Sequence, residues 1–448
     1  MRKKYLLPFI LLMIVVVAGA FNPGQSMIGS SAGNIDTGDT AWMLMSCALV
    51  MIMTPALGFF YGGLANSKNI ISTVFQSFIS LGVISIIWVV FGFSLCFGED
   101  VGGLGIIGNP WTFRMFKDVG LSPNETFSAS IPFIVYAIFQ LKFAVIAPAL
   151  ITGSFAQRVR FSAYLIFIVL FFIFIYAPLC HMTWHPDGIL FKYGVLDFAG
   201  GTVVHMSAGL AALAGAMFMG QRTESERTHE YSNIPYVIIG AGLLWFGWFG
   251  FNAGSGLGCN AKSANALATT NTAAAAAMLA WLFLDALRGN KISSIGACIG
   301  AVVGLVAITP ACGFVNTGES IAIGAISAIV SNFAVHYKNK STLDDTLDVF
   351  PCHGVGGIMG MIFTAIFAAD YGTGLAVDDW GLVYGKYKTF TVHMIALVAV
   401  AAFAFIGSYI LYYITNKIEP MRVSKEEEEL GLDITQHGES YLTLKIDL

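Results

Sequence analysis

The chain has 448 residues, of which 56% are hydrophobic and only 11% charged, and its mean hydropathy is +0.74. Soluble domains carry roughly a quarter charged residues, so this composition excludes an ordinary soluble fold and indicates a polytopic membrane protein. The net charge of −4 comes without a large basic patch, so nucleic acid is not expected as a partner. The seven cysteines show no CxxC spacing, and we expect neither a metal site nor a disulfide framework.

The first 20 residues are typical of a secretory signal peptide. Arg2, Lys3 and Lys4 form a basic start, an apolar stretch follows, and Ala18-Gly19-Ala20 is a small-residue cleavage site. We therefore expect residues 1–20 to be cleaved off. The alternative is an uncleaved first helix.

Eleven apolar stretches follow, each close to the ~20 residues that cross a bilayer as a helix. They lie at 40–63, 71–97, 131–154, 161–180, 198–220, 234–256, 264–287, 293–313, 319–337, 352–369 and 389–415. We predict an all-α polytopic membrane protein, with inverted five-helix repeats plus one extra helix. The transmembrane domain covers 21–416, and 417–448 form a tail.

Basic residues in the loops predict the orientation, because they concentrate on the cytoplasmic side. Twelve lie on the side of the tail and five on the other side. The larger group is Lys68, Arg158, Arg160, Arg222, Arg227, Arg288, Lys291, Lys338, Lys340, Lys417, Arg422 and Lys425. We expect the tail in the cytoplasm, the mature amino terminus outside, and the protein in the cell membrane among its lipids.

Two histidines lie in apolar, glycine-rich segments of these spans. His205 falls near the start of the fifth helix and His353 near the start of the tenth. An ionisable ring inside a bilayer is costly, so its default interpretation is a transport pathway or a proton relay. Since five is an odd number, an inverted repeat would bring both positions together near the midplane. The alternative is two core histidines bonded to carbonyls.

An aromatic stripe with a hydroxyl lies near the outer end of the sixth helix. Trp248, Phe251 and Ser255 recur three and four residues apart, so they share one face. Trp184, in HMTWHPDG, is a candidate for a further ring. Aromatic faces attract cations by ~0.5–2 kcal/mol, and a hydroxyl beside them suits a small cation that donates hydrogen bonds. The alternative is core packing or an interface belt.

Such a cation does not continue inward as an ion. The idealised cost of moving an ammonium-sized ion into an apolar medium is on the order of 20 kcal/mol. A weak acid has another route, because it leaves its proton behind and crosses as a neutral molecule. Neutral imidazoles at His205 and His353 would then hydrogen-bond to that molecule, and we expect no resident cofactor.

An aspartate precedes each histidine, and both aspartates admit two interpretations. Asp197 and Asp348 either bind cations directly or cap their helices by accepting amide hydrogen bonds. The residue type favours capping at both positions.

Six motifs resemble those of the Amt/Mep/Rh ammonium transporters, in the same order and over nearly the whole chain after residue 20. They are GFFYGGL (58–64), TGSFAQRVRFSA (152–163), DFAGGTVVH (197–205), GWFGFNAGS (247–255), TPACG (309–313) and DVFPCHGVGG (348–357). The resemblance implies a homotrimer in which each protomer has eleven helices and its own hydrophobic pore.

The resemblance also implies a role for each matching residue. Phe143 and Phe251 resemble a stacked gate, while Trp184 and Ser255 resemble the outer ammonium recruitment site, with Tyr176 and Gln140 nearby. A final group resembles the vestibule aspartate, the paired pore histidines and two further pore-lining residues: Asp197, His205, His353, Trp248 and Thr309. Two features depart from the family pattern, Lys142 before the gate and the HPDG segment after Trp184.

The function that these motifs imply is an ammonium transporter, not an enzyme. It would recruit NH4+, remove a proton and conduct NH3, with methylammonium as a usable analogue. The tail resembles the family's cytoplasmic regulatory tail, at which a nitrogen-regulatory PII protein docks. One alternative is an ammonium sensor that signals through the tail. Another, a redox enzyme with His205 and His353 as haem ligands, is disfavoured because it would need histidine pairs within single helices, and these two lie on different predicted helices.

Overall fold

The computed structural model describes residues 5–21, 35–227 and 231–441. In this part of the chain the regular elements are helices, joined by loops with three isolated β-bridges. The predicted all-α fold is therefore confirmed.

Ten helices in the described residues are long and apolar enough to cross a membrane, and a shorter apolar helix stands at the remaining predicted span. The first half contains α2 (Thr37–Leu64), α3 to α4 (Ile70–Phe97), α5 (Phe133–Ile151), α6 to α8 (Phe161–Lys192) and η7 with α9 (Gly201–Met219). The second half contains α11 (Ile234–Gly254), α12 (Ala261–Leu287), the shorter α13 (Ser294–Ile308), α14 (Thr317–Asn339) and η8 with α15 (Phe350–Phe367). The eleventh is α16 (Tyr387–Ile418).

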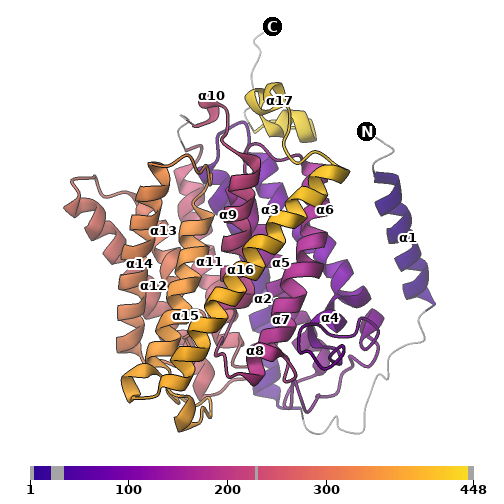
Figure 1. The fold of residues 1–448 in the computed structure, drawn as a ribbon. Coiled ribbons are helices and arrows are strands. Elements are labelled where there is room, and N and C mark those ends of the chain that lie inside the picture. The colour runs from indigo at the N-terminus through magenta and orange to yellow at the C-terminus, as the bar shows by residue number, and fades with distance from the viewer. Residues whose placement is uncertain (1–4, 22–34, 228–230, 442–448) are drawn as a thin grey trace.

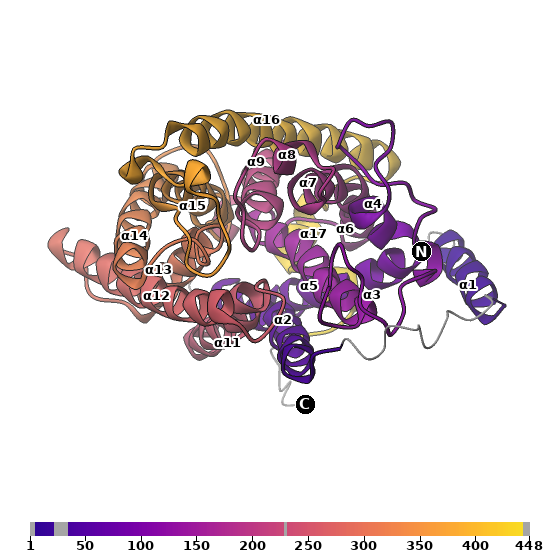
Figure 2. The same ribbon diagram turned by 90° about the horizontal axis from the view of Figure 1, so that it is seen from below.

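The two halves stand side by side, and α16 spans both of them. Figure 2 shows the first half on the right and the second half on the left, with α16 running along one edge of the bundle. In Figure 1 the same helix crosses the front diagonally, where it packs against α6, α9 and α15. The extra helix thus holds the two halves together.

Several spans are interrupted by single π-helical turns. Two of them, η7 (Gly201–Met206) and η8 (Phe350–Val355), contain the histidines that the sequence singled out. A π-turn adds one residue to a helical turn, and such turns occur often at functional sites. Both of these turns are at the start of the last span of their half, which is the position that the inverted repeat predicts.

The first helix, α1 (Leu6–Ala20), stands beside the bundle, and none of its residues is buried. This position fits a segment that the bundle does not need. Cleavage after residue 20 stays a prediction.

The tail folds back onto the end of the bundle where α3 begins. After α17 (Lys425–Leu430), the carboxylate of Asp433 accepts the backbone N–H groups of Ile71 at 3.1 Å and Ser72 at 2.8 Å. The local residue Asn69 does not cap this helix, because its side-chain oxygen accepts the N–H of Leu432 instead. The tail therefore supplies the N-terminal cap of a membrane span.

Candidate functional site

The two histidines meet at the centre of the bundle. The Nδ1 atoms of His205 and His353 lie 3.4 Å apart, and their rings stack with centroids 5.4 Å apart. Both residues are almost fully buried. A neutral imidazole has one donor nitrogen and one acceptor nitrogen, so one ring donates its Nδ1 proton to the other. The pairing that the sequence predicted is present in the structure.

Glycines allow the two helices to cross closely enough for this contact. Gly209 lies four residues after His205, and a Cβ atom there would collide with the backbone of Gly354. Gly357 lies four residues after His353, and a Cβ atom there would be 3.1 Å from the backbone N of Met206. Each half thus places a glycine against the residue that follows the histidine of the other half. This reciprocal contact is what an inverted repeat requires.

Asp197 caps η7, which we call the outer turn after the orientation predicted from the sequence; η8 is correspondingly called the inner turn. Its carboxylate accepts the backbone N–H groups of Gly200, Gly201 and Thr202 at 2.8, 2.6 and 2.7 Å, and the Thr202 hydroxyl also donates to it. The side chain is buried, with 8% of the residue exposed. All four hydrogen bonds to its carboxylate come from its own turn, so the Asp197 side chain orients the turn that carries His205.

Asp348, in contrast, does not cap the inner turn, and the prediction of capping at this position was wrong. The N–H of Phe350 donates to Asp345 at 2.7 Å, while Asp348 forms an ion pair of 2.6 Å with Lys338. Asp345 lies eight residues before His353, as Asp197 lies eight residues before His205. That spacing is the sequence pattern that would have identified Asp345.

The same offset explains what Asp348 does. It occupies the position that Gly200 has in the outer turn, and both residues have positive φ, 59° for Asp348 and 122° for Gly200. Aspartate tolerates the left-handed region better than most residues. Asp348 therefore provides the left-handed backbone conformation that its turn requires, while its carboxylate pairs with Lys338.

A narrow cavity of about 10 Å³ opens beside the histidine pair. Three lining residues have polar side-chain atoms, His205, His353 and Trp248, and the other lining residues are apolar: Met53, Leu57, Phe60, Ile146, Leu150, Val204, Leu244, Phe251 and Val302. This volume is about what one water molecule needs. Nε2 of His205 is buried and has no hydrogen-bond partner in the described part of the chain. The cavity therefore suits one small polar molecule that hydrogen-bonds to an imidazole.

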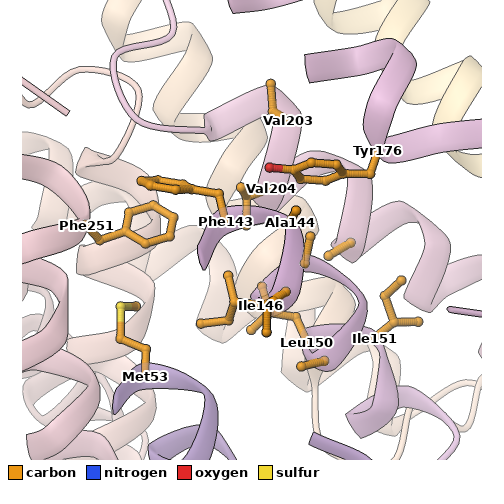
Figure 3. Packing of buried hydrophobic residues seen from close by; sticks show 14 of the residues in the cluster. Met53, Phe143, Ala144, Ile146, Leu150, Ile151, Tyr176, Val203, Val204 and Phe251 are labelled. Atoms are coloured by element: carbon orange, nitrogen blue, oxygen red, sulfur yellow. The ribbon is translucent and has the colours of Figure 1, made fainter. Parts of the chain in front are cut away.

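The two phenylalanines of the expected gate lie against each other next to this cavity. The ring centroids of Phe143 and Phe251 are 4.3 Å apart, and the rings are tilted by 41°. Figure 3 shows the pair facing each other, with Met53 and Ile146 beyond them. Phe251 also stacks on His205, with centroids 5.8 Å apart. The rings thus form a continuous aromatic path that ends at the histidines.

Trp184 extends this path away from the histidines. Its ring lies edge-on to Phe143 with centroids 5.8 Å apart, and its Nε1–H donates to the backbone oxygen of Asp197 at 3.0 Å. Trp184 is the last residue of α7 (Ala177–Trp184), one residue before the HPDG segment. Ser255 follows α11, where its hydroxyl donates to the backbone oxygen of Phe251 at 2.8 Å.

Trp248 and Thr309 are held together behind His205. The Nε1–H of Trp248 donates to the hydroxyl of Thr309 at 2.9 Å, and Trp248 stacks on His205 with centroids 5.4 Å apart. Thr309 donates in turn to the backbone oxygen of Leu305. This chain of bonds fixes the indole that faces the imidazole.

Two further predicted residues, Tyr176 and Gln140, lie near Phe143. Tyr176 ends the π-turn η6 (Phe172–Tyr176), and Figure 3 shows its hydroxyl directed toward Val204 and Phe143. Gln140 is buried one turn before Phe143 on α5. The Tyr176 hydroxyl and the Gln140 side-chain oxygen have no hydrogen-bond partner among the described residues. Lys142 does not line the cavity.

Charges at the tail side of the bundle surround the inner turn. Burial raises the pKa of Asp345 to about 6, and the carboxylate of Asp348 adds to this, while the ammonium of Lys338 opposes it. Burial alone would also raise the pKa of Asp344, but the hydrogen bond from Arg222 and the charge of Arg158 lower it to about 2. Two adjacent aspartates therefore have pKa values displaced in opposite directions.

Comparison with known proteins agrees with this geometry. The sequence profile of the Ammonium Transporter Family matches residues 41–442. A putative ammonium transporter of Methanothermobacter thermautotrophicus is 43% identical over 413 residues, which cover 91% of this chain and 98% of that protein. The ammonium transporter of Aquifex aeolicus is 43% identical over 422 residues, which cover 94% and 97%.

A solved structure shares the fold. The crystal structure of Saccharomyces cerevisiae Mep2 superposes with a TM-score of 0.85 at 33% sequence identity, and the match covers 94% of this chain and 95% of that chain. The chain therefore belongs to the Ammonium Transporter Family, as a non-enzymatic, multi-pass membrane protein that transports ammonium.

Proposed function

We propose that the protein recruits NH4+ at the Trp184 end of the aromatic path, removes one proton and conducts NH3 past the histidine pair. The observation that carries this proposal is the contact between the Nδ1 atoms of His205 and His353 beside a cavity with mostly apolar walls. Two neutral imidazoles in such a place offer hydrogen bonds to a small neutral molecule and no charge to stabilise an ion.

Recruitment rests on the aromatic rings and the nearby polar groups. Trp184 and Phe143 meet edge to face, and aromatic faces attract cations by ~0.5–2 kcal/mol. The Ser255 hydroxyl lies one helical turn from Phe251 and accepts a hydrogen bond from the cation. The unpartnered oxygens of Tyr176 and Gln140 offer further acceptors beside Phe143. The cation thus exchanges part of its hydration shell for rings and oxygens.

We expect deprotonation because moving the ammonium ion into the cavity beside the histidines costs free energy. The cavity has room for about one water-sized molecule, so an ammonium ion entering it would lose its hydration. The idealised cost of that step is on the order of 20 kcal/mol, and the only polar side chains that line the cavity in the described structure are His205, His353 and Trp248. Ammonia is neutral and avoids this desolvation cost, and it can form a hydrogen bond with Nε2 of His205, which has no other partner in the described structure.

The assembly and its orientation extend the proposal. The protein acts as a homotrimer in the cell membrane, with its tail in the cytoplasm and Trp184 facing outside. Residues 417–448 form a regulatory tail at which a PII protein docks. The described part of this tail contains α17, whose first turn includes Glu426, Glu427 and Glu428.

Current recording on protein reconstituted in vesicles tests the mechanism. Under an ammonium gradient, transport of NH3 alone gives uptake without current, and separate transfer of the proton gives one charge per ammonia. A current carried equally by K+ would contradict the proposal, since K+ has no proton to leave behind.

Replacing Trp184 with leucine tests recruitment. We expect the apparent KM for methylammonium to rise about tenfold with a smaller change in maximum rate, because the variant loses a cation–π contact and keeps the pore. Phenylalanine at the same position is the matched control and should recover most of the affinity. An unchanged KM in the leucine variant would remove Trp184 from the recruitment site.

A further inference from the structure

A second, much larger cavity lies on the Trp184 side of the protein. It has a volume of about 660 Å³ and opens between the 98–131 segment and the loop that follows α7. Its walls include aromatic rings, carboxylates and one histidine: Glu99, Trp111, Phe113, Asp118, Phe127 and His185. We call it the loop pocket. Its volume is within the range of small-molecule sites, about 300–1,000 Å³, and it is separate from the histidine pair.

The walls of the loop pocket are fixed by long-range contacts. His181 on α7 contacts the backbone oxygen of Cys96 through Nδ1 at 2.9 Å and the carboxylate of Asp100 through Nε2 at 3.2 Å. The N–H of Ile189 donates to the backbone oxygen of Gly105 at 2.9 Å. These contacts join the 98–131 segment to both ends of the HPDG loop, so a ligand would meet a preformed site and lose less affinity to ordering.

His185 offers the pocket a buried hydrogen-bond donor. Only 6% of the residue is exposed, and its ring stacks on His181 with centroids 4.3 Å apart. Its Nδ1 accepts the N–H of Asp187 at 3.0 Å, so the proton of the neutral ring is on Nε2. No residue of the described chain accepts from that Nε2. A ligand oxygen in the loop pocket would satisfy it.

Carboxylates and aromatic rings in the rest of the lining indicate which second chemical group a ligand of the loop pocket would carry. Glu99 and Asp118 line the pocket and form no salt bridge within the described residues, whereas Asp187 pairs with Lys192 at 3.1 Å. Lys117 is the one lysine or arginine that the described lining contains. The guanidinium of Arg114 lies 5.4 Å from the centre of the Trp111 ring, so this ring already accepts a cation on its face. The two carboxylates of Glu99 and Asp118 outnumber the ammonium of Lys117, so the net unpaired charge of the lining is negative, and it lies beside aromatic rings.

We propose that the loop pocket binds an organic ammonium ion that carries a hydroxyl group. The cationic end meets Glu99, Asp118 and the rings, and the hydroxyl oxygen accepts the Nε2–H of His185. Such a ligand is too large for the cavity of about 10 Å³ beside the histidine pair, so the loop pocket is a binding site and not part of the conducting path.

Calorimetric titration of the full-length protein in detergent with choline tests this proposal. We expect one choline per chain with a Kd in the millimolar range or below. The neutral isostere 3,3-dimethylbutan-1-ol has the same shape without the charge and should bind at least tenfold more weakly. Equal binding of the two compounds, or no heat up to 50 mM choline, would overturn the proposal.

Three variants locate the site. Glu99→Gln combined with Asp118→Asn should weaken choline at least tenfold, because both unpaired carboxylates are lost, and His185→Phe should weaken it about threefold through the lost hydrogen bond. Asp378→Asn, at an exposed carboxylate paired with Lys386 in another loop, is the matched control and should leave the affinity unchanged. Choline binding that survives the double variant would place the ligand elsewhere and refute the loop pocket.

The test is independent of the mechanism proposed for the pore. It measures binding and not uptake, so a pore that fails the current recording can still bind choline, and a protein that transports ammonium can fail to bind it.

Discussion

The outer and inner turns have similar backbones and different electrostatic surroundings. In both, an aspartate eight residues before the histidine accepts backbone N–H groups, a residue with positive φ follows, and a π-turn presents the ring. Asp197 receives four hydrogen bonds from its own turn. Asp345 receives the N–H of Phe350 but leaves its Oδ1 buried without a partner in the described structure.

The comparison shows that an inverted repeat conserves geometry without conserving charge. The outer carboxylate is saturated by neutral donors, so its charge is stabilised locally. The inner carboxylate shares its surroundings with Asp348 and Lys338, and burial raises its pKa to about 6. The carboxylate of Asp197 therefore has all its side-chain partners in its own turn, whereas that of Asp345 has charged neighbours.

The largest effect is expected from the histidine pair, where the two halves meet. His205→Ala or His353→Ala should lower methylammonium uptake at least a hundredfold, or open the pore to K+, because either change leaves one imidazole without its partner. Uptake in vesicles with and without K+ measures both outcomes. His336→Ala, at a histidine outside the pore on α14, is the control. Normal uptake and selectivity in both variants would refute a pore role for the pair.

The two caps should differ in what they contribute to stability. Asp197→Asn removes an acceptor from an amide cluster and places an NH2 group there, which should cost about 3 kcal/mol. Asp345→Asn should cost about 1 kcal/mol or less at pH 7, because the ionised carboxyl that it replaces is itself unfavourable when buried. Thermal unfolding in detergent measures the difference. Equal losses would mean that the two turns are electrostatically alike.

The pH dependence of the same pair sharpens the comparison. Because the folded pKa of Asp345, about 6, is above its unfolded value, its stabilising contribution is complete below about pH 4 and is lost as the pH rises through 6. Two pKa units correspond to on the order of 2–3 kcal/mol. As the pH rises from 4 to 7, the thermal unfolding temperature of the unaltered protein should decrease relative to that of the Asp345→Asn variant. Parallel curves over this range would contradict the shift.

Asp344 acts in another pH window, so the two aspartates can be separated. Its pKa is lowered to about 2, and its contribution is present above about pH 4 and lost as the pH falls toward 2. Measurements kept above pH 4 therefore report Asp345.

A last pair of variants tests the positive-φ position of each turn. Gly200→Ala should cost about 1–3 kcal/mol, because φ is 122° and the new Cβ would lie 2.9 Å from Cγ2 of Val204. Asp348→Gly should cost less than about 1 kcal/mol, since relief of its backbone strain offsets the lost pair with Lys338. Unfolding midpoints of the two variants measure both values. A larger loss for Asp348→Gly would show that the ion pair, and not the backbone, holds the inner turn.

Much of the fold and part of the site followed from local sequence patterns. The eleven apolar stretches predicted the spans. A segment that crosses a bilayer must satisfy its backbone hydrogen bonds within its own helix and present apolar side chains over the full membrane thickness, so it has to be long and apolar. The contact between His205 and His353 followed from the odd number of helices in each half. The prediction for Asp348 failed because proximity to His353 was used in place of the repeat offset that points to Asp345.

The sequence by itself determined the membrane class, the number of spans and the two histidines, since hydrophobic length and rare ionisable residues are visible residue by residue. Only the tertiary structure decided that Gly209 and Gly357 form a reciprocal crossing, that Asp433 caps α3 from more than 350 positions away, and that the 98–131 segment closes a pocket over His185. These features depend on contacts between distant segments, whose pairing is set by the packing of the whole bundle and leaves no periodic pattern in either segment alone.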